Sequence, residues 1–354
     1  MALTILAPPS ILIVRFAAIG DVVMATPLLR ALRARHPQAH IAFLTERQYA
    51  PLLAESPHLD EVIAVAPDES LRALARRVPA SRFSHRLDLD GSLRSRALRL
   101  LAGGKWQFVR GEGGTGALGA LGALGDWARF GPRLRRSSRP EFVPLAERYF
   151  EAAGDLDVRP DGLPPEICAG PEAEAEAERW LAKAGLGQGR ALVVFAPGGP
   201  HEVRRWPGAH WVKLATRLAQ TGADVVLVGG VEDSPFTTEI VLRSGSPHVR
   251  SAAGELSLGG SAAVLARASA VVSGDTGPLH VATGVGAPVV GLYGPTTRQS
   301  GLFPYRGTAT VLERDFACRP CDARDGDPCP LGHHGCLHSI TVDDVFEALC
   351  RTAR

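Results

Sequence analysis

The stretch Ala270-Val-Val-Ser-Gly-Asp-Thr-Gly-Pro-Leu-His280 contains the unit that we expect to build the whole fold. Its first four residues predict the end of a buried strand, and Gly274 permits an abrupt turn after it. Asp275 and Thr276 are good caps for a helix start, and Pro278 suits the first helical turn, where an N–H group would have no partner. The stretch therefore predicts a strand, a tight turn and a helix, the repeating unit of parallel α/β sheets.

The same unit recurs along most of the chain. Short runs rich in Val, Ile and Leu alternate with helical stretches, and the runs are continuously apolar. Continuous apolarity is typical of strands that are covered on both faces, as in parallel α/β sheets. The expected strands are 11–16, 40–45, 61–65, 86–90, 191–196, 224–229, 268–273 and 288–293.

A proline-rich stretch without periodicity, residues 160–171, divides the chain, whose 354 residues are enough for two domains. We therefore expect an N-terminal domain at 1–165 and a second domain at 172–340, which carries a cysteine-rich loop at 318–336. Two such α/β domains in succession would form a cleft between the carboxyl ends of their strands. Open α/β sheets bind their ligands at those ends.

The composition, 45% hydrophobic and 21% charged, is that of an ordinary globular protein. The net charge of +2 gives no reason to expect a nucleic-acid partner. No apolar run reaches the roughly 18 residues of a membrane-spanning helix, and the N-terminus does not resemble a secretory signal. We expect a cytoplasmic protein, with peripheral contact to a membrane surface as a further option, and the sequence does not predict an oligomeric state.

A low-complexity segment interrupts the first domain. Residues 111–125 repeat Gly-Ala-Leu, and glycine weakens a helix by about 1 kcal/mol at each position. An arginine-rich segment, residues 129–139, follows directly. We interpret the two segments as a mobile insertion. The arginines are typical of a solvated surface, and an anion-binding patch is the alternative.

Two arginines follow the glycine turn after strand 191–196. Gly198 lies in this turn, and a guanidinium group can pair with phosphate through two hydrogen bonds. Arg204 and Arg205 are therefore candidates for holding a diphosphate. Loop arginines are more often merely solvated, so this pattern alone decides little.

The turn after strand 224–229 is also rich in glycine. Gly229 and Gly230 would let a ligand approach the backbone, and Glu232 could accept hydrogen bonds from ribose hydroxyls. The pattern is neither the dinucleotide-binding fingerprint nor a P-loop. It is compatible with the floor of a nucleoside site.

The turn at Asp275 and Thr276 has the features of an anion site. Backbone N–H groups and the helix dipole attract phosphate to a helix start, and Gly277 removes a Cβ atom from its path. A well-capped helix without a ligand is the simpler interpretation of this turn alone. A second Gly/Pro-rich segment, residues 286–295, is expected at the same sheet edge and favours a ligand site.

The first domain repeats the pattern in Arg15-Phe-Ala-Ala-Ile-Gly-Asp21. Asp21 follows Gly20 at a helix start, where it could cap the helix or accept a proton from a hydroxyl group. The residues alone leave both interpretations open. Pro27 lies inside the apparent helix and predicts a kink or a later start.

Taken in order, these segments resemble those of glycosyltransferase family 9, the lipopolysaccharide heptosyltransferases, over nearly the whole chain. The resemblance implies a GT-B fold, in which two Rossmann-like, doubly wound parallel-sheet domains face a central cleft. It also implies an inverting transfer of heptose, without a catalytic metal, from a nucleotide-diphosphate donor that is typically ADP-heptose. The expected acceptor is lipopolysaccharide core or a related glycolipid, or a protein. The segments that carry the resemblance are Gly20-Asp21, Thr26-Pro27-Leu28, Arg204-Arg205-Trp206-Pro207, Asp275-Thr276-Gly277-Pro278, His280 and residues 318–340.

The resemblance also implies roles for individual residues. Asp21 would be the general base on the acceptor hydroxyl, with Gly20 and Thr26 on the acceptor side. Glu232 would lie near the nucleoside. Arg204 stands where the family commonly has Lys, so the catalytic position keeps its charge but gains a forked geometry. The sugar-diphosphate site would consist of Asp275, Thr276, Gly277 and His280.

We expect the enzyme in the cytoplasm, with peripheral contact to the cytoplasmic face of the inner membrane as a further option. In GT-B enzymes a C-terminal helix often returns to the first domain. Residues 342–351 have an amphipathic helical pattern, so the segment 341–354 is a candidate for that helix.

A group of cysteines near the C-terminus has partly metal-like spacing. The first two form a Cys-x2-Cys pair, but the other two are too widely spaced for a zinc ribbon. A loop held by zinc or iron and a set of reduced, packed cysteines are equally compatible with this spacing. Similar cysteine-bearing tails occur in the family, and we expect a structural metal without a catalytic role. The four cysteines are Cys318, Cys321, Cys329 and Cys336, and further candidate ligands are His333, His334 and His338.

Two other functions are compatible with the same fold. A nucleotide-sugar epimerase would need a second carboxylate that acts on the sugar itself. A non-catalytic nucleotide-sugar-binding protein would explain the loss of the family lysine at Arg204. Neither alternative accounts for both Asp21 and Asp275 as directly as a transferase does.

Overall fold

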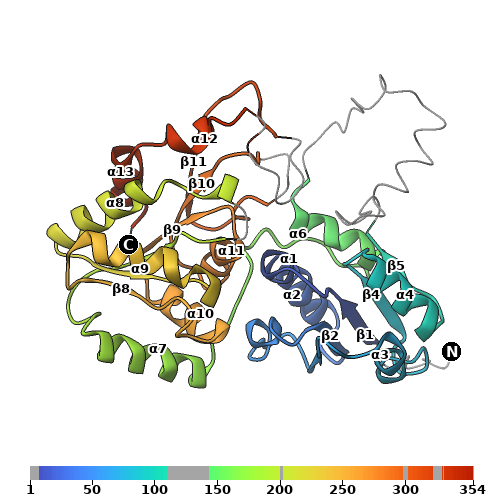
Figure 1. Cartoon of the computed structure of the whole chain (residues 1–354). Coiled ribbons are helices and arrows are strands. Elements are labelled where there is room, and N and C mark those ends of the chain that lie inside the picture. Colours follow the sequence, from blue (N-terminus) through green and yellow to red (C-terminus); the bar gives the residue numbers. More distant parts are fainter. Residues whose placement is uncertain are drawn as a thin grey trace. The chain divides into compact units, whose positions relative to one another are not determined.

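A computed structural model describes residues 8–109, 143–199, 202–297, 302–321, 329 and 331–353. The chain forms two compact units, Met1–Asp161 and Gly162–Arg354 (Figure 1). The division falls within the proline-rich stretch expected as the linker, slightly ahead of the predicted domain limits. The glycine-rich and arginine-rich segments of the predicted insertion lie outside the described residues.

The first unit is built on a parallel five-stranded sheet with the strand order β3-β2-β1-β4-β5. The central strand β1 pairs with β2 on one side and with β4 on the other. The chain therefore changes direction across the sheet between β1 and β4, and such a switch point is where open α/β sheets bind ligands. The strands are β1 (Ser10–Val14), β2 (His40–Glu46), β3 (Glu61–Val65), β4 (His85–Asp88) and β5 (Gln107–Phe108).

Helices cover this sheet because its strands are apolar on both faces. Leu12 and Val14 pack in one core with Leu74 and Leu98 of the helices, whereas Ile13, on the opposite face of β1, is also fully buried. The helical segments are α1 (Ile19–Met24), α2 (Thr26–Arg35), η1 (Ala50–Leu52), α3 (Leu71–Arg77), α4 (Leu93–Ala102), α6 (Leu145–Arg148) and η2 (Tyr149–Leu156).

The second unit has a parallel six-stranded sheet with the order β11-β10-β9-β6-β7-β8. Its switch point lies between β6 and β9, which pair directly. All strands expected from the sequence are present in both units, whereas β5, β8 and β11 were not predicted. The strands are β6 (Leu192–Ala196), β7 (Asp224–Leu227), β8 (Val249–Ser251), β9 (Ala270–Gly274), β10 (Val289–Tyr293) and β11 (Ala309–Glu313).

The helices of the second unit cover both faces of its sheet. One face packs with α8, α9 and α13 around Trp206 and Trp211. On the other face Leu279 of α11 lies against Gly291, and α11 contacts α10, which packs on α7. The helical segments are α7 (Pro171–Ala184), η3 (Glu202–Arg204), α8 (Gly208–Gln220), η4 (Val231–Asp233), α9 (Ser234–Ser244), α10 (Leu258–Ala266), α11 (Gly277–Gly284), α12 (Gly335–His338) and α13 (Val342–Thr352).

The C-terminal helix α13 packs within the second unit. Its apolar stripe, Val345, Ala348 and Leu349, is buried in the core of the second unit. Just before the helix, the Ile340 carbonyl accepts a 2.8 Å hydrogen bond from the indole of Trp206. The helix therefore belongs to the second unit, and its predicted return to the first domain stays a prediction. The described residues contain no helix that is both long and apolar enough to cross a membrane.

Candidate active site

Three loops meet at the carboxyl edge of the second sheet. They follow β6, β7 and β9, which are neighbours in the sheet. A Cβ atom built on Gly199 would lie 2.9 Å from Cγ2 of Thr276, and one on Gly274 would lie 3.1 Å from the carbonyl oxygen of Arg204. Gly199 also has a φ of 136°, which side chains rarely permit. These glycines therefore allow the loops to touch, and the loops carry the residues predicted to bind the donor.

The buried carboxylate of Asp233 joins two of these loops. Its Oδ1 accepts a hydrogen bond from the backbone N–H of Gly199 at 3.1 Å, and its Oδ2 accepts one from Gly230 at 3.2 Å. A Cβ atom on Gly198 would collide with it at 2.1 Å. Gly198, Gly229 and Gly230 thus surround a carboxylate that the sequence analysis missed. Its only signal was its place directly after Glu232 in the glycine-rich turn.

The helix start of α11 is confirmed, but its capping differs from expectation. Thr276 is the N-cap residue and Pro278 lies in the first turn. The Thr276 side chain makes no capping hydrogen bond, because its hydroxyl lies 3.2 Å from the hydroxyl of Ser273. The N-cap side chain therefore leaves the first N–H groups of α11 uncapped, which include that of Gly277. This helix start can accept an anion.

Asp275 is the buried charge of this turn. It is only 5% exposed, and its Oδ2 has no hydrogen-bond partner among the described residues. Burial, followed by the charges of Asp275 and Glu313, raises the pKa of Tyr293 well above its usual value. An unsatisfied buried carboxylate oxygen is costly, so Oδ2 is suited to accept a hydrogen bond from a ligand. His280, one turn further along α11, is also buried.

The two arginines predicted as a diphosphate clamp differ in their surroundings. The Arg205 guanidinium donates twice to the carbonyl of Gly199, with 2.9 Å for Nε, and lies 5.8 Å from the ring of Phe236. It therefore holds the β6 loop in place. Arg204 is half-buried, and its carbonyl oxygen lies against Gly274. Glu232 is exposed, and its carboxylate lies over Gly230.

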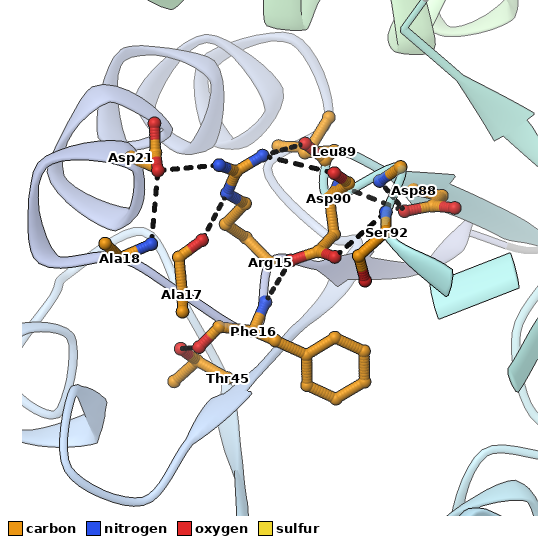
Figure 2. A network of polar contacts seen from close by, with 11 residues as sticks. Arg15, Phe16, Ala17, Ala18, Asp21, Thr45, Asp88, Leu89, Asp90 and Ser92 are labelled. Carbon is orange, nitrogen blue, oxygen red and sulfur yellow. Dashed lines mark hydrogen bonds and ion pairs between the residues drawn. The ribbon is translucent and has the colours of Figure 1, made fainter. Parts of the chain in front are cut away.

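Asp21 lies at a polar network of the first unit (Figure 2). It is the third residue of α1, whose N-cap is Ala18, and not the cap itself. Its Oδ2 accepts a 3.1 Å hydrogen bond from the N–H of Ala18 and pairs at 2.6 Å with Nη2 of Arg15. The carboxylate is 21% exposed, so a ligand can reach it. Gly20 is half-buried directly before it.

Thr26 lies at the junction of α1 and α2. Its side chain is buried, and its hydroxyl donates to the carbonyl of Val23 at 2.8 Å. The expected interruption at Pro27 is present, because α1 ends at Met24 and α2 begins at Thr26. Thr26 therefore stabilises the junction between these two helices, and its place on the acceptor side stays a prediction.

The loop after β4 completes the network at the switch point of the first sheet. Oδ2 of Asp90 accepts from the N–H of Phe16 at 2.9 Å, and its Oδ1 accepts from the N–H of Ser92 at 3.2 Å. Asp88 in turn accepts from the N–H of Asp90 at 3.0 Å (Figure 2). These contacts fix the loop beside Arg15. The sequence signal was two aspartates at the end of an expected strand, and we assigned them no role.

The cysteine cluster lies in the second unit. All four thiols are free, with Cys329 and Cys336 buried. Burial, and then the neighbouring Cys318, Cys336 and Cys329, raise the pKa of the Cys321 thiol, so the four sulfur atoms lie near one another. A hydrogen bond from the backbone N–H of His334 lowers the pKa of the Cys329 thiol and outweighs burial, which would raise it. Within the described residues, which omit 322–328 and 330, no group of three or more side chains is arranged to hold a metal ion.

Two successive parallel α/β units with polar loops at the carboxyl ends of their strands are the architecture of GT-B glycosyltransferases. The family model described as glycosyltransferase family 9 (heptosyltransferase) matches residues 71–327. The chain belongs to this family and is a glycosyltransferase, as the resemblance predicted. The match favours neither the epimerase nor the non-catalytic alternative.

Relatives and solved structures agree with this assignment. The chain is 29% identical over 360 residues to lipooligosaccharide heptosyltransferase 2 of Haemophilus influenzae, covering 96% of this chain and 98% of the relative. The structure of Escherichia coli ADP-heptose lps heptosyltransferase II is similar with a TM-score of 0.73 and 25% identity, covering 97% of this chain and 98% of that one. A family 9 glycosyltransferase from Veillonella parvula has the same fold, with a TM-score of 0.77, 22% identity and 97% coverage of both chains.

Proposed function

We propose that this glycosyltransferase is an inverting heptosyltransferase. It transfers heptose from ADP-heptose to a hydroxyl group of lipopolysaccharide core or a related glycolipid. The names of its relatives support the sugar, the donor and the acceptor class. Within the structure, the proposal is carried by the loop edge of the second sheet, where an uncapped helix start adjoins the unsatisfied Oδ2 of Asp275.

The donor side follows from this arrangement. A departing nucleoside diphosphate gathers negative charge, which the N-terminus of α11 and the cation of Arg204 would stabilise. Asp275 would accept a hydrogen bond from a sugar hydroxyl through Oδ2. Glu232, exposed beside Gly230, would accept hydrogen bonds from the ribose. Arg205 would act indirectly, because its guanidinium holds the Gly199 turn.

The acceptor side rests on Asp21. Its carboxylate would take the proton of the attacking hydroxyl as the new bond to the sugar carbon forms. The bond from that carbon to the diphosphate breaks on the opposite face, through an oxocarbenium-like transition state. This sequence of events inverts the configuration at the sugar carbon. No step requires a metal ion.

The decisive experiment incubates the purified protein with ADP-heptose and heptose-deficient lipopolysaccharide. The proposal expects release of ADP only when acceptor is present. Conversion of the nucleotide sugar without acceptor would indicate an epimerase, and no turnover with tight donor binding would indicate a binding protein. A thermal shift provides the binding readout, because a ligand at 100 times its Kd adds about 2.7 kcal/mol of stability.

We propose a structural metal, zinc or iron, for the cysteine cluster. Thiolates suit both metals, and the mutual effects of Cys318, Cys321, Cys329 and Cys336 on the Cys321 pKa support a common site. Metal analysis of the purified protein before and after chelation tests this. The Cys321→Ser variant should lose the metal, whereas Cys350→Ser, at an exposed cysteine outside the cluster, should keep it. Metal-free protein of unchanged thermal stability would refute the proposal.

We propose peripheral contact with the cytoplasmic face of the inner membrane through α4. Leu93, Leu100 and Leu101 are exposed on this helix, with Leu100 85% exposed, and Phe108 of β5 is exposed as well. Arg96 is exposed on the same helix, which has no acidic residue. Exposed leucines beside arginines are suited to a membrane interface with anionic headgroups.

Sedimentation with vesicles tests this surface. Vesicles that contain phosphatidylglycerol should retain the protein more strongly than vesicles of phosphatidylcholine. The double variant Leu100→Gln, Leu101→Gln should lose this preference, and Leu242→Gln, at an exposed leucine of α9 in the second unit, should keep it. Equal sedimentation of the double variant and the wild type would refute the role of α4.

A further inference from the structure

Arg15 holds three parts of the first unit together. It follows the last residue of β1, and its guanidinium has a different partner on each nitrogen (Figure 2). Nε donates to the carbonyl of Ala17 at 2.7 Å, and Nη1 donates to the carbonyl of Leu89 at 2.6 Å. Nη2 pairs with Oδ2 of Asp21 at 2.6 Å. The guanidinium thus connects the end of β1, the loop after β4 and the start of α1.

The surroundings keep Arg15 charged. Its side chain is only 13% exposed. Burial lowers the pKa of Arg15, but the neighbouring Tyr149, Asp21 and Asp90 outweigh burial and raise it. The guanidinium carbon also lies 5.9 Å from the centre of the Tyr149 ring. A cation that is fixed on several sides and shielded from water is a strong orienting group for a neighbouring carboxylate.

The two oxygens of Asp21 consequently have different environments. Oδ2 is occupied by Arg15 and by the N–H of Ala18. Oδ1 has no hydrogen-bond partner in the part of the chain that the structure describes, and the carboxylate is 21% exposed. Tyr49 also faces this carboxylate. Burial, followed by the charges of Glu46 and Asp21, raises the pKa of Tyr49. Only Oδ1 is therefore presented to a ligand.

We infer that Arg15 is a positioning residue for Asp21, which directs Oδ1 to the attacking hydroxyl. The inference rests on the proposed role of Asp21 as the general base. In the reaction the hydroxyl proton moves to Oδ1, the oxygen bonds to the sugar carbon, and the diphosphate leaves with the electron pair of the broken bond. Arg15 stays protonated throughout and does not touch the substrate.

The alternative is that Arg15 only stabilises the fold, and kinetics separate the two roles. We expect Arg15→Met to lower kcat by about 10- to 100-fold, the size of effect that misplacing a catalytic group by about 1 Å produces. KM for the nucleotide sugar should not change. Arg15→Lys should restore only part of kcat, since it keeps the charge without the fork.

The chain offers a matched control in the same unit. Arg30 pairs with Asp161 at 2.6 Å through Nε, and its side chain is 15% exposed, so its ion pair is as short as that of Arg15 and its guanidinium is similarly buried. Arg30→Met should lower stability alone and leave kcat unchanged. If Arg15→Met behaves in the same way, the inference is overturned and Arg15 has only a structural role.

Further variants separate this inference from the proposed function. If Asp21→Asn transfers sugar at the normal rate, the base assignment fails and the role of Arg15 fails with it. If Asp21→Asn is inactive but Arg15→Met and Arg15→Lys keep the wild-type kcat, only the positioning role fails. The double variant Arg15→Met, Asp21→Asn should be no slower than Asp21→Asn alone, because both changes act through the same carboxylate. If Arg15→Met does not fold, the loss of kcat is measured on Arg15→Lys, and a wild-type kcat in that variant would also overturn the inference.

Discussion

Replacement of Asp233 by Asn should weaken donor binding more than it weakens the fold. The carboxylate accepts one backbone hydrogen bond from Gly199 and one from Gly230, and it is buried between them. An amide keeps one acceptor oxygen but turns an NH2 group toward the other N–H. One hydrogen bond to a charged group is lost, which is worth about 1.5–3 kcal/mol. If this loss falls on the bound state, Kd for ADP-heptose rises about 10- to 150-fold, since 1.4 kcal/mol corresponds to tenfold.

Calorimetric titration of ADP-heptose, with urea unfolding in parallel, measures both quantities. Asp343→Asn is the matched control, because Asp343 forms an ion pair with Arg217 at 2.5 Å but is 78% exposed. Exposed pairs contribute about 0–1 kcal/mol, so this variant should bind the donor normally. Unchanged Kd for Asp233→Asn, with a loss of unfolding free energy alone, would refute the view that Asp233 shapes the donor site.

Three further outcomes are expected. Asp21→Asn should reduce transfer by about 100-fold or more while Kd for ADP-heptose, measured by thermal shift, stays constant; normal turnover would exclude the base role. Asp275→Asn should raise Kd for ADP-heptose but leave Kd for ADP nearly unchanged, and an equal effect on both would place Asp275 away from the sugar. Burial raises the pKa of Asp344, but hydrogen bonds from Thr341 and the ion pair with Arg314 outweigh burial and lower this pKa. Its folded pKa therefore lies below its unfolded value, so wild type should be more stable than Asp344→Asn by about 1 kcal/mol at pH 7. This difference should disappear as the pH falls below about 4, and persistence at pH 3 in urea unfolding would contradict it.

The strands that form the interior of both sheets could be predicted from the sequence. Continuous apolar runs bounded by glycine turns mark β1, β2, β6, β7, β9 and β10, because a strand covered on both faces needs apolar residues at every position. The strands that were missed lie at sheet edges. β5 is short, and β11 is at most half-buried, so neither shows this pattern. An edge strand is defined by its neighbour and not by its own composition.

The amphipathic pattern of α13 predicted a helix but not its place. Apolar residues three and four positions apart show only that one face is buried. The core around Trp206 decides which sheet this face meets. For the same reason, the sequence showed that Thr26 is part of a motif. It did not show that its hydroxyl is buried and donates to the carbonyl of Val23.

The sequence by itself determined that Asp21 and Asp275 stand at turns between strands and helices, because glycine, aspartate and proline act on backbone conformation within a few residues. Only the tertiary structure decided which side chains hold these turns. Asp233 meets Gly199 across 34 residues, and Arg15 meets Leu89 across 74. Both contacts depend on strand order, which places β6 beside β7 and β1 beside β4. Strand order follows from the packing of the whole unit, and no local pattern records it.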